Sequence, residues 1–276
     1  MKKIIFSLSL AIGISAFAQT SCCSKPDETF AMLTHDKKFV ASHLEPLPFT
    51  LENPLGKEIS FKTPDGKEGY GYEIKAKKAT DNYVFVFHEW WGLNDYIKQE
   101  CEKIYNTLGN VNVIAIDLYD KKVATTRDSA AKYAGSITAP RGEAIVKGAR
   151  NYAGEKANIA TIGWCLGGGW SMKASLLAGS KGRACVMYYG TPEDDVEKIQ
   201  NLFPPVLFIW AEQDKWINKD MVTKFEANMA NTKKSLTVKK YNADHAFANP
   251  SNPKYNKEFA DDAFKLAMEF IKKHLK

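Results

Sequence analysis

A regular alternation of short apolar segments with amphipathic segments constrains the fold of this chain more than any other feature. The apolar segments have the length and β-branched content of buried strands, and the amphipathic segments have helical spacing. Such alternation builds a mostly parallel sheet with helices on both faces, which is the α/β class, and it places chemistry at the carboxyl ends of the strands. We expect strands at 83–87, 111–116, 158–162, 184–189, 206–210 and 235–241, and helices at 95–108, 141–153, 219–229 and 256–275.

Two earlier segments, 57–62 and 69–75, follow a different pattern. They flank Pro64-Asp65-Gly66-Lys67, a group of turn residues that predicts a hairpin. We therefore expect an antiparallel start to the sheet. From residue 57 to residue 276 we expect one catalytic domain, because this length lies within the single-domain range of α/β folds.

The N-terminus has the order of a secretory signal peptide. Lys2 and Lys3 precede an apolar run at 4–14, and the small-residue site Ala16-Phe17-Ala18 follows. The run is too short to span a bilayer, so we expect cleavage after residue 18, export, and a periplasmic location. A lipid anchor at Cys22 or Cys23 is the alternative. Residues 19–56 then form a leader that we expect to pack on the domain surface, with one helix at 28–43.

The charge and the cysteine pattern argue against several classes of partner. The net charge of +6 is mild and the lysines are scattered, so we expect no nucleic-acid partner, and an anionic small substrate is at most slightly favoured. Cys101 lies in a helical pattern and Cys185 in an apolar strand, so we expect both to be buried hydrophobic residues. No C-x-x-C motif or histidine cluster is present in the sequence, and we predict no metal and no cofactor.

The segment Gly163-Trp164-Cys165-Leu166-Gly167 has the pattern of a nucleophile elbow with cysteine in the serine position. Small residues on both sides allow a sharp turn from strand to helix. Cys165 then lies at the N-terminus of a helix beginning near Leu166, where free N–H groups and the helix dipole favour the thiolate. The alternative is a glycine-rich turn that holds an inert, packed cysteine.

Candidate partners for this thiol follow later strands. Asp214 lies in the loop after 206–210, although Glu212 in the same loop could take its role, and His245 follows the last strand. The order nucleophile, acid, histidine is that of a hydrolase triad, in which the carboxylate fixes the tautomer of the imidazole. His88 resembles a satisfied core histidine. The remaining histidines, His35, His43 and His274, lie in the leader or the final helix and fit the position of the base less well.

These motifs together resemble the dienelactone hydrolase family of α/β-hydrolases, from about residue 57 to the C-terminus. The resemblance rests on the cysteine elbow, on His88-Glu89-Trp90-Trp91-Gly92-Leu93-Asn94, on Asp214 and on Asp244-His245-Ala246-Phe247. It implies an α/β-hydrolase fold and hydrolysis of lactones or small carboxylic esters.

The resemblance also implies roles for individual residues. Cys165, His245 and Asp214 would form the triad, and Glu89 would abstract the thiol proton. The backbone N–H groups of Leu166 and Trp90 would form the oxyanion hole.

This sequence departs from the best-known members of the family in substrate recognition. Asn249 stands where the dienelactone-cleaving enzymes carry an arginine for the substrate carboxylate, and export differs from their cytoplasmic location. Arg127, in a possible lid, is the candidate replacement for that arginine, and Trp91 is a candidate wall of an aromatic pocket. Rival functions are an acyl transferase, a thioesterase or a carbohydrate esterase on the same scaffold, and a binding protein without turnover.

Overall fold

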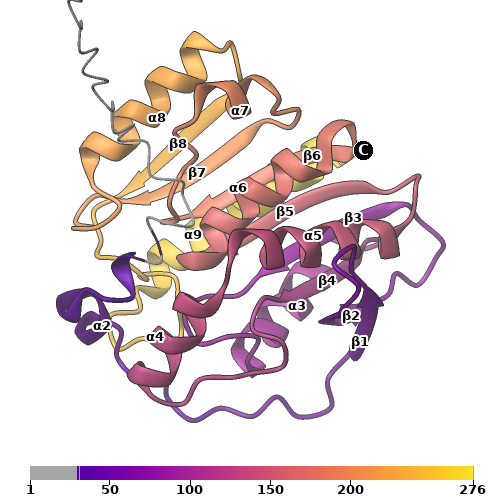
Figure 1. Ribbon diagram of the computed structural model, residues 1–276, viewed down its shortest axis with the longest axis horizontal. Coiled ribbons are helices and arrows are strands. Elements are labelled where there is room, and N and C mark those ends of the chain that lie inside the picture. Colours follow the sequence, from indigo (N-terminus) through magenta and orange to yellow (C-terminus); the bar gives the residue numbers. More distant parts are fainter. Residues whose placement is uncertain (1–29, 31, 276) are drawn as a thin grey trace, which may run out of the picture.

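The computed structural model describes residue 30 and residues 32–275, and it contains one eight-stranded sheet (Figure 1). The predicted signal peptide and the possible anchor at Cys22 or Cys23 lie outside the described residues. The strands are β1 (Lys57–Lys62), β2 (Glu68–Ile74), β3 (Asn82–Phe87), β4 (Asn112–Asp117), β5 (Asn158–Trp164), β6 (Gly182–Tyr188), β7 (Val206–Ala211) and β8 (Leu236–Tyr241).

The order of the strands is β1-β2-β4-β3-β5-β6-β7-β8. β1 pairs antiparallel with β2 and β2 antiparallel with β4, while every later pair is parallel. The central strands β4 and β7 are buried along their whole length, as expected for strands covered on both faces. The α/β-hydrolase fold with an antiparallel start, predicted from the sequence, is therefore confirmed.

Helices cover both faces of this sheet (Figure 1). On one face α6 packs on β5 and β6 and contacts α5, and on the other α9 packs on β6 and β7 and contacts α3. The helices are α2 (Lys37–Ser42), α3 (Asp95–Leu108), α4 (Arg127–Ser136), α5 (Ala139–Ala153), α6 (Leu166–Ala178), α7 (Val196–Gln200), α8 (Lys219–Asn231) and α9 (Lys257–His274).

Local side chains explain where the long helices begin. The side chains of Asn94, Asn218 and Asn256 accept hydrogen bonds from backbone N–H groups in the first turns of α3, α8 and α9. These bonds satisfy donors that have no partner within the helix. α3 ends at Gly109, whose φ of 86° suits a residue without a Cβ.

The N-terminal segment belongs to the same core as the sheet. Phe30 and Phe39 are buried in the main hydrophobic cluster together with residues of β3, β4 and β5. The single helix predicted at 28–43 is wrong in its described part, because α2 starts afresh after Asp36. The carboxylate of Asp36 accepts from the N–H groups of Lys38 and Phe39 and thereby starts the new helix. α2 contacts α4, so the two short helices lie together (Figure 1).

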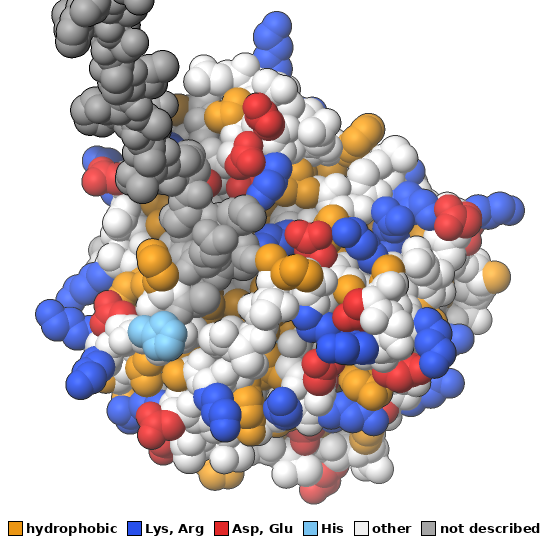
Figure 2. Space-filling view, in the orientation of Figure 1, with side chains coloured by type: hydrophobic (Ala, Val, Ile, Leu, Met, Phe, Trp, Pro, Cys, Tyr) orange, Lys and Arg blue, Asp and Glu red, His pale blue; other side chains and the backbone are white. Residues whose placement is uncertain are grey.

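Charged side chains are mixed on the face shown in Figure 2, where lysine and arginine alternate with aspartate and glutamate rather than forming one basic band. Among the described residues, none of the helices has both the length and the apolarity that a membrane span requires.

Candidate active site

The elbow at Cys165 has a strained backbone, with φ of 53° and ψ of −117°. Two glycines make this turn possible. A Cβ on Gly163 would lie 2.1 Å from the carbonyl oxygen of Gly167, and a Cβ on Gly167 would lie 2.2 Å from that of Phe87. Backbone atoms on both sides leave no room for a side chain, so strand β5 can turn directly into α6 and hold the sulfur at the start of that helix.

The side chains of Cys165, His245 and Asp214 form one hydrogen-bonded chain that begins at this sulfur. The Nε2 atom of His245 lies 3.1 Å from the Sγ atom of Cys165, and its Nδ1 atom lies 2.6 Å from Oδ2 of Asp214. The other oxygen of Asp214 accepts from the N–H groups of Trp216 and Ile217. Such a chain can hold a nucleophile, a base and the carboxylate that orients the base.

The alternative acid, Glu212, has a different position. Its side chain is exposed, whereas Asp214 is buried beside the imidazole. The backbone N–H of Glu212 bonds the carbonyl of Tyr241 and continues the pairing of β7 with β8. Asp214 is therefore the carboxylate of this loop that contacts His245.

Burial and hydrogen bonds act in opposite directions on these groups. Burial of His245 disfavours the imidazolium, but the charges of Asp214 and Cys165 more than offset burial and raise the pKa of His245 well above its ordinary value. Burial raises the pKa of the Cys165 thiol, opposed by His245 and by the N–H of Leu166. Burial would raise the pKa of Asp214, yet His245 and the two loop N–H groups lower it. The carboxylate is thus charged and can stabilise an imidazolium.

Glu89 is buried at the end of β3 and has two hydrogen-bond partners. The hydroxyl of Tyr189 donates to its Oε1 over 3.2 Å, and the side-chain amide of Asn249 donates to its Oε2. Burial raises the pKa of Glu89 to about 7, although His245, Tyr189 and Asn249 oppose the rise. In this arrangement each carboxylate oxygen is hydrogen-bonded to a residue other than Cys165.

His88 fixes the backbone at Glu89 through hydrogen bonds of both its ring nitrogens. Its Nε2 accepts from the N–H of Leu118 over 3.1 Å, and its Nδ1 donates to the carbonyl of Glu89 over 2.8 Å. Both ring nitrogens are thus paired with the backbone in a fully buried neutral ring, as expected of a core histidine.

Of the two backbone N–H groups expected to form the oxyanion hole, that of Leu166 contacts the sulfur. The N–H of Leu166 hydrogen-bonds the Cys165 sulfur, and the hydroxyl of Tyr119 donates to the carbonyl of Trp90 over 3.1 Å. Trp90 is buried, and its indole N–H has no partner among the described residues. The Leu166 N–H thus lies at the sulfur at the start of α6, and its role toward a reacting carbonyl stays a prediction.

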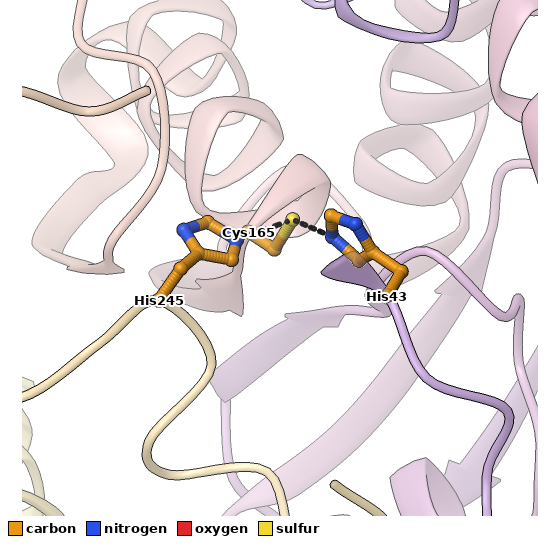
Figure 3. A group of neighbouring side chains, drawn as sticks. All are labelled: His43, Cys165 and His245. Carbon is orange, nitrogen blue, oxygen red and sulfur yellow. Dashed lines mark hydrogen bonds between the residues drawn. The ribbon is translucent and has the colours of Figure 1, made fainter. Parts of the chain in front are cut away.

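His43 also reaches the site, which the sequence reasoning missed. Its Nε2 lies 3.8 Å from the sulfur of Cys165, on the other side from His245 (Figure 3). Its ring stacks on Trp90 at 4.8 Å, and Phe39, one turn earlier, packs on the same indole. The four-residue spacing of Phe39 and His43 indicated that one face of this segment is buried. It did not indicate which residues that face contacts.

Two cavities adjoin these residues. One of about 370 Å³ is lined by His43, His245 and Asp214, with Lys38, Lys215 and Lys254 among its other residues. A much smaller one is lined by Trp91, Glu89 and Asn249. Neither lining includes Arg127, which begins α4. Cys101 and Cys185 are buried and unpaired, as predicted from the sequence.

Comparison with known proteins agrees with this architecture. The model of the dienelactone hydrolase family matches residues 70–275. A protein of Aquifex aeolicus (strain VF5) named "Putative carboxymethylenebutenolidase" is 29% identical over 237 residues, covering 80% of this chain and 100% of that protein. "Protein usf" of Aquifex pyrophilus is 30% identical over 234 residues, with the same two coverages. The solved structure named "m3DLH" has a TM-score of 0.70 at 17% identity, covering 80% of this chain and 98% of its own.

Proposed function

This chain belongs to the dienelactone hydrolase family, and on that premise we propose that it is an exported hydrolase of lactones or small carboxylic esters. The observation that carries the proposal is the hydrogen-bonded chain from Cys165 through His245 to Asp214. The name of the Aquifex aeolicus relative, a carboxymethylenebutenolidase, points to the same class of reaction.

In the proposed mechanism the thiol of Cys165 loses its proton to a base and the sulfur attacks the carbonyl carbon of the ester. The N–H groups of Leu166 and Trp90 bind the oxyanion of the tetrahedral intermediate. The intermediate collapses to a thioester and releases the alcohol, which takes the proton back from that base. His245, oriented by Asp214, then removes a proton from water as the water attacks the thioester. The C–S bond breaks, the carboxylic acid leaves, and the sulfur takes its proton from His245.

Glu89 assists the first step in this scheme. Its pKa of about 7 suits a group that accepts and returns a proton near neutral pH. In the absence of substrate, hydrogen bonds from Tyr189 and Asn249 fix the position of the carboxylate.

We expect neutral esters to be turned over at least as well as acidic dienelactones. Asn249 stands where a cation would bind a substrate carboxylate, and its amide instead contacts Glu89. A strong preference in kcat/KM for the carboxylate-bearing substrate would contradict this expectation. It would indicate that another cation, such as Arg127 or a lysine of the 370 Å³ cavity, binds the substrate carboxylate.

The hydrolase proposal is tested with p-nitrophenyl acetate and the purified protein. We expect Cys165→Ala to abolish hydrolysis above background, because the nucleophile is lost, and Cys185→Ala to retain it. Cys185 is a suitable control because it is equally buried but lies in the core beneath α6. Full activity in Cys165→Ala would overturn the assignment of the nucleophile.

Export is tested separately. The signal-peptide pattern predicts that the exported protein begins at Gln19 when its N-terminus is sequenced. A retained precursor, or a diacylglyceryl group on Cys22 or Cys23, would contradict soluble export.

A further inference from the structure

Two histidines and a cysteine converge at one point of the site. The Nε2 atoms of His43 and His245 and the Sγ atom of Cys165 all lie within 4.8 Å of one another, and all three residues are buried. The two rings approach the sulfur from opposite sides, His43 from the N-terminal segment and His245 from the loop after β8 (Figure 3). Imidazole nitrogen and thiolate sulfur are the preferred ligands of Zn²⁺ in proteins.

The outer hydrogen bonds of both rings are those of metal-binding histidines. The Nδ1 of His43 lies 2.8 Å from the backbone carbonyl of Phe39, and the Nδ1 of His245 lies 2.6 Å from the carboxylate of Asp214. Each acceptor fixes a proton on Nδ1, so Nε2 is the ring atom that faces the sulfur, and His245 binds an ion through it in its neutral form. Histidine ligands of zinc typically donate their second N–H to a backbone carbonyl or a carboxylate, which fixes the ring and its tautomer.

We propose that His43, Cys165 and His245 form a binding site for a thiophilic divalent metal ion, with Zn²⁺ the best match, and that the bound ion blocks the thiol. The blocking role rests on the proposed function of Cys165 as a nucleophile. The binding of the ion does not, because it follows from the three ligand atoms alone.

The two nitrogen–sulfur distances suit this ion, and the two nitrogens lie within 4.8 Å of each other. Tetrahedral zinc with Zn–N bonds of about 2.05 Å and a Zn–S bond of about 2.3 Å places nitrogen and sulfur ~3.6 Å apart, and two nitrogens ~3.4 Å apart. The two nitrogen–sulfur distances, 3.1 Å and 3.8 Å, lie on either side of that value. To close the coordination sphere, the two rings must approach until their Nε2 atoms are ~3.4 Å apart.

Protons and charges balance on binding. The proton held between the Cys165 sulfur and the Nε2 of His245 goes to solvent, a Zn–S bond and two Zn–N bonds form, and five of the six water ligands of the hydrated ion leave while one stays. Both histidines line the cavity of about 370 Å³, so we expect a water ligand from it in the fourth position.

Metal binding removes the two groups that the proposed hydrolysis needs. The sulfur lone pair is engaged by the ion, and the Nε2 of His245 can no longer accept a proton. Without His43 only two protein ligands remain. The residue that caps the C-terminus of α2 thus turns a catalytic pair into a three-ligand site.

The test of binding uses Co²⁺ as a spectroscopic probe of the full chain, without reference to activity. We expect a thiolate-to-cobalt charge-transfer band in the near ultraviolet and visible bands typical of tetrahedral cobalt, both lost when one equivalent of Zn²⁺ is added. Cys165→Ser should remove the charge-transfer band. His43→Phe, which retains an aromatic ring against Trp90, should weaken binding at least about tenfold, as expected for loss of a ligand.

The matched control is His35→Phe, which removes an exposed histidine from the same N-terminal segment and should bind the ion as the wild type does. Circular dichroism verifies the folding of each variant. Equal affinity of the wild type and a folded His43→Phe protein, or a cobalt complex without a sulfur band, would overturn the site.

Inhibition is measured against the metal-free rate of each variant. We expect Zn²⁺ to inhibit ester hydrolysis by the wild type reversibly, with recovery after chelation, and the half-inhibiting concentration to rise at least about tenfold in His43→Phe. Faster hydrolysis by the zinc-loaded protein would overturn the blocking role. Metal binding by a protein that never hydrolyses esters would reject the proposed function and leave the metal site standing.

Discussion

The side-chain amide of Asn249 donates a hydrogen bond to Oε2 of Glu89 across 160 positions of the sequence. The Oδ1 atom of Asn249 in turn accepts from the N–H and the hydroxyl of Ser251. Asn249, which we expect in place of an anion-binding arginine, is thus held by its own loop and hydrogen-bonds the buried carboxyl group of Glu89. This relationship links the departure from the family pattern to the protonation of Glu89.

Replacing Asn249 by alanine should move the pH dependence of catalysis to higher pH. The Asn249 hydrogen bond lowers the pKa of Glu89, which burial has raised to about 7, so loss of the bond raises this pKa further. If the charged carboxylate is the active form, the rate increases as pH rises through the pKa, and the ascending limb shifts upward. The pH profile of kcat/KM measures the shift. Asn201→Ala, a remote and exposed control, should leave the limb in place.

Glu89→Gln should slow formation of the acyl-enzyme. The substitution keeps the shape of the side chain but removes the base, and general-base catalysis contributes typically ~10²–10⁴-fold. Stopped-flow measurement of the acylation burst isolates this step, with circular dichroism as a check on folding. A burst rate within about threefold of the wild type, far below the general-base range, would leave His245 as the base for both steps.

Phe39→Ala should expose Cys165 to alkylation. Phe39 packs against Trp90, Trp216 and His43 and thereby holds α2 near Cys165, a residue that is only 2% exposed. Loss of a buried phenylalanine costs about 3–5 kcal/mol, and ~1.4 kcal/mol of easier local opening speeds labelling tenfold. Iodoacetamide labelling followed by peptide mass spectrometry gives the rate.

The two other buried thiols serve as internal controls for this experiment. Cys101 and Cys185 are fully buried in the core. Faster labelling of all three cysteines would indicate global unfolding, and unchanged labelling of Cys165 would show that α2 does not control access.

Gly167→Ala should destabilise the protein far more than Gly169→Ala in the same helix. A Cβ on Gly167 would lie 2.2 Å from the Phe87 carbonyl oxygen, which is backbone and cannot move aside, whereas a Cβ on Gly169 would meet its nearest atom at 3.3 Å. Overpacking costs about 1–3 kcal/mol or more. Denaturant unfolding measures both variants, and equal midpoints would contradict the close approach of α6 to β3.

His43 should make folding stability fall in acid. Its pKa is lowered from 6.5 to about 3 in the folded protein, so below pH 6.5 the unfolded chain takes up a proton that the folded chain does not. Stability should therefore decrease between pH 6.5 and about pH 3, by at most about 1.4 kcal/mol per pH unit from this group. His43→Phe should show a shallower decline in urea unfolding measured at pH 7 and pH 4.5. Parallel declines would show that the ring is protonated in the folded state.

Most of the fold could be predicted because the relevant signals are local. The apolar segment predicted at 206–210 is the strand β7 at Val206–Ala211, and the helix predicted at 95–108 is α3. Hydrophobic periodicity and asparagine caps act over one or two turns, so a single sequence carries them. The same holds for the elbow, where the spacing of Gly163 and Gly167 around Cys165 allows a sharp turn.

Contacts between distant segments were decided by the tertiary structure. The sequence left Glu212 and Asp214 as alternatives, and the pairing of β7 with β8 directs Asp214 to His245 and Glu212 to solvent. His43 lies 122 positions before Cys165, in a segment expected on the surface. Its place depends on how the rings of α2 pack on Trp90, and no local pattern encodes that packing, because side chains from separate elements meet only when the chain is folded.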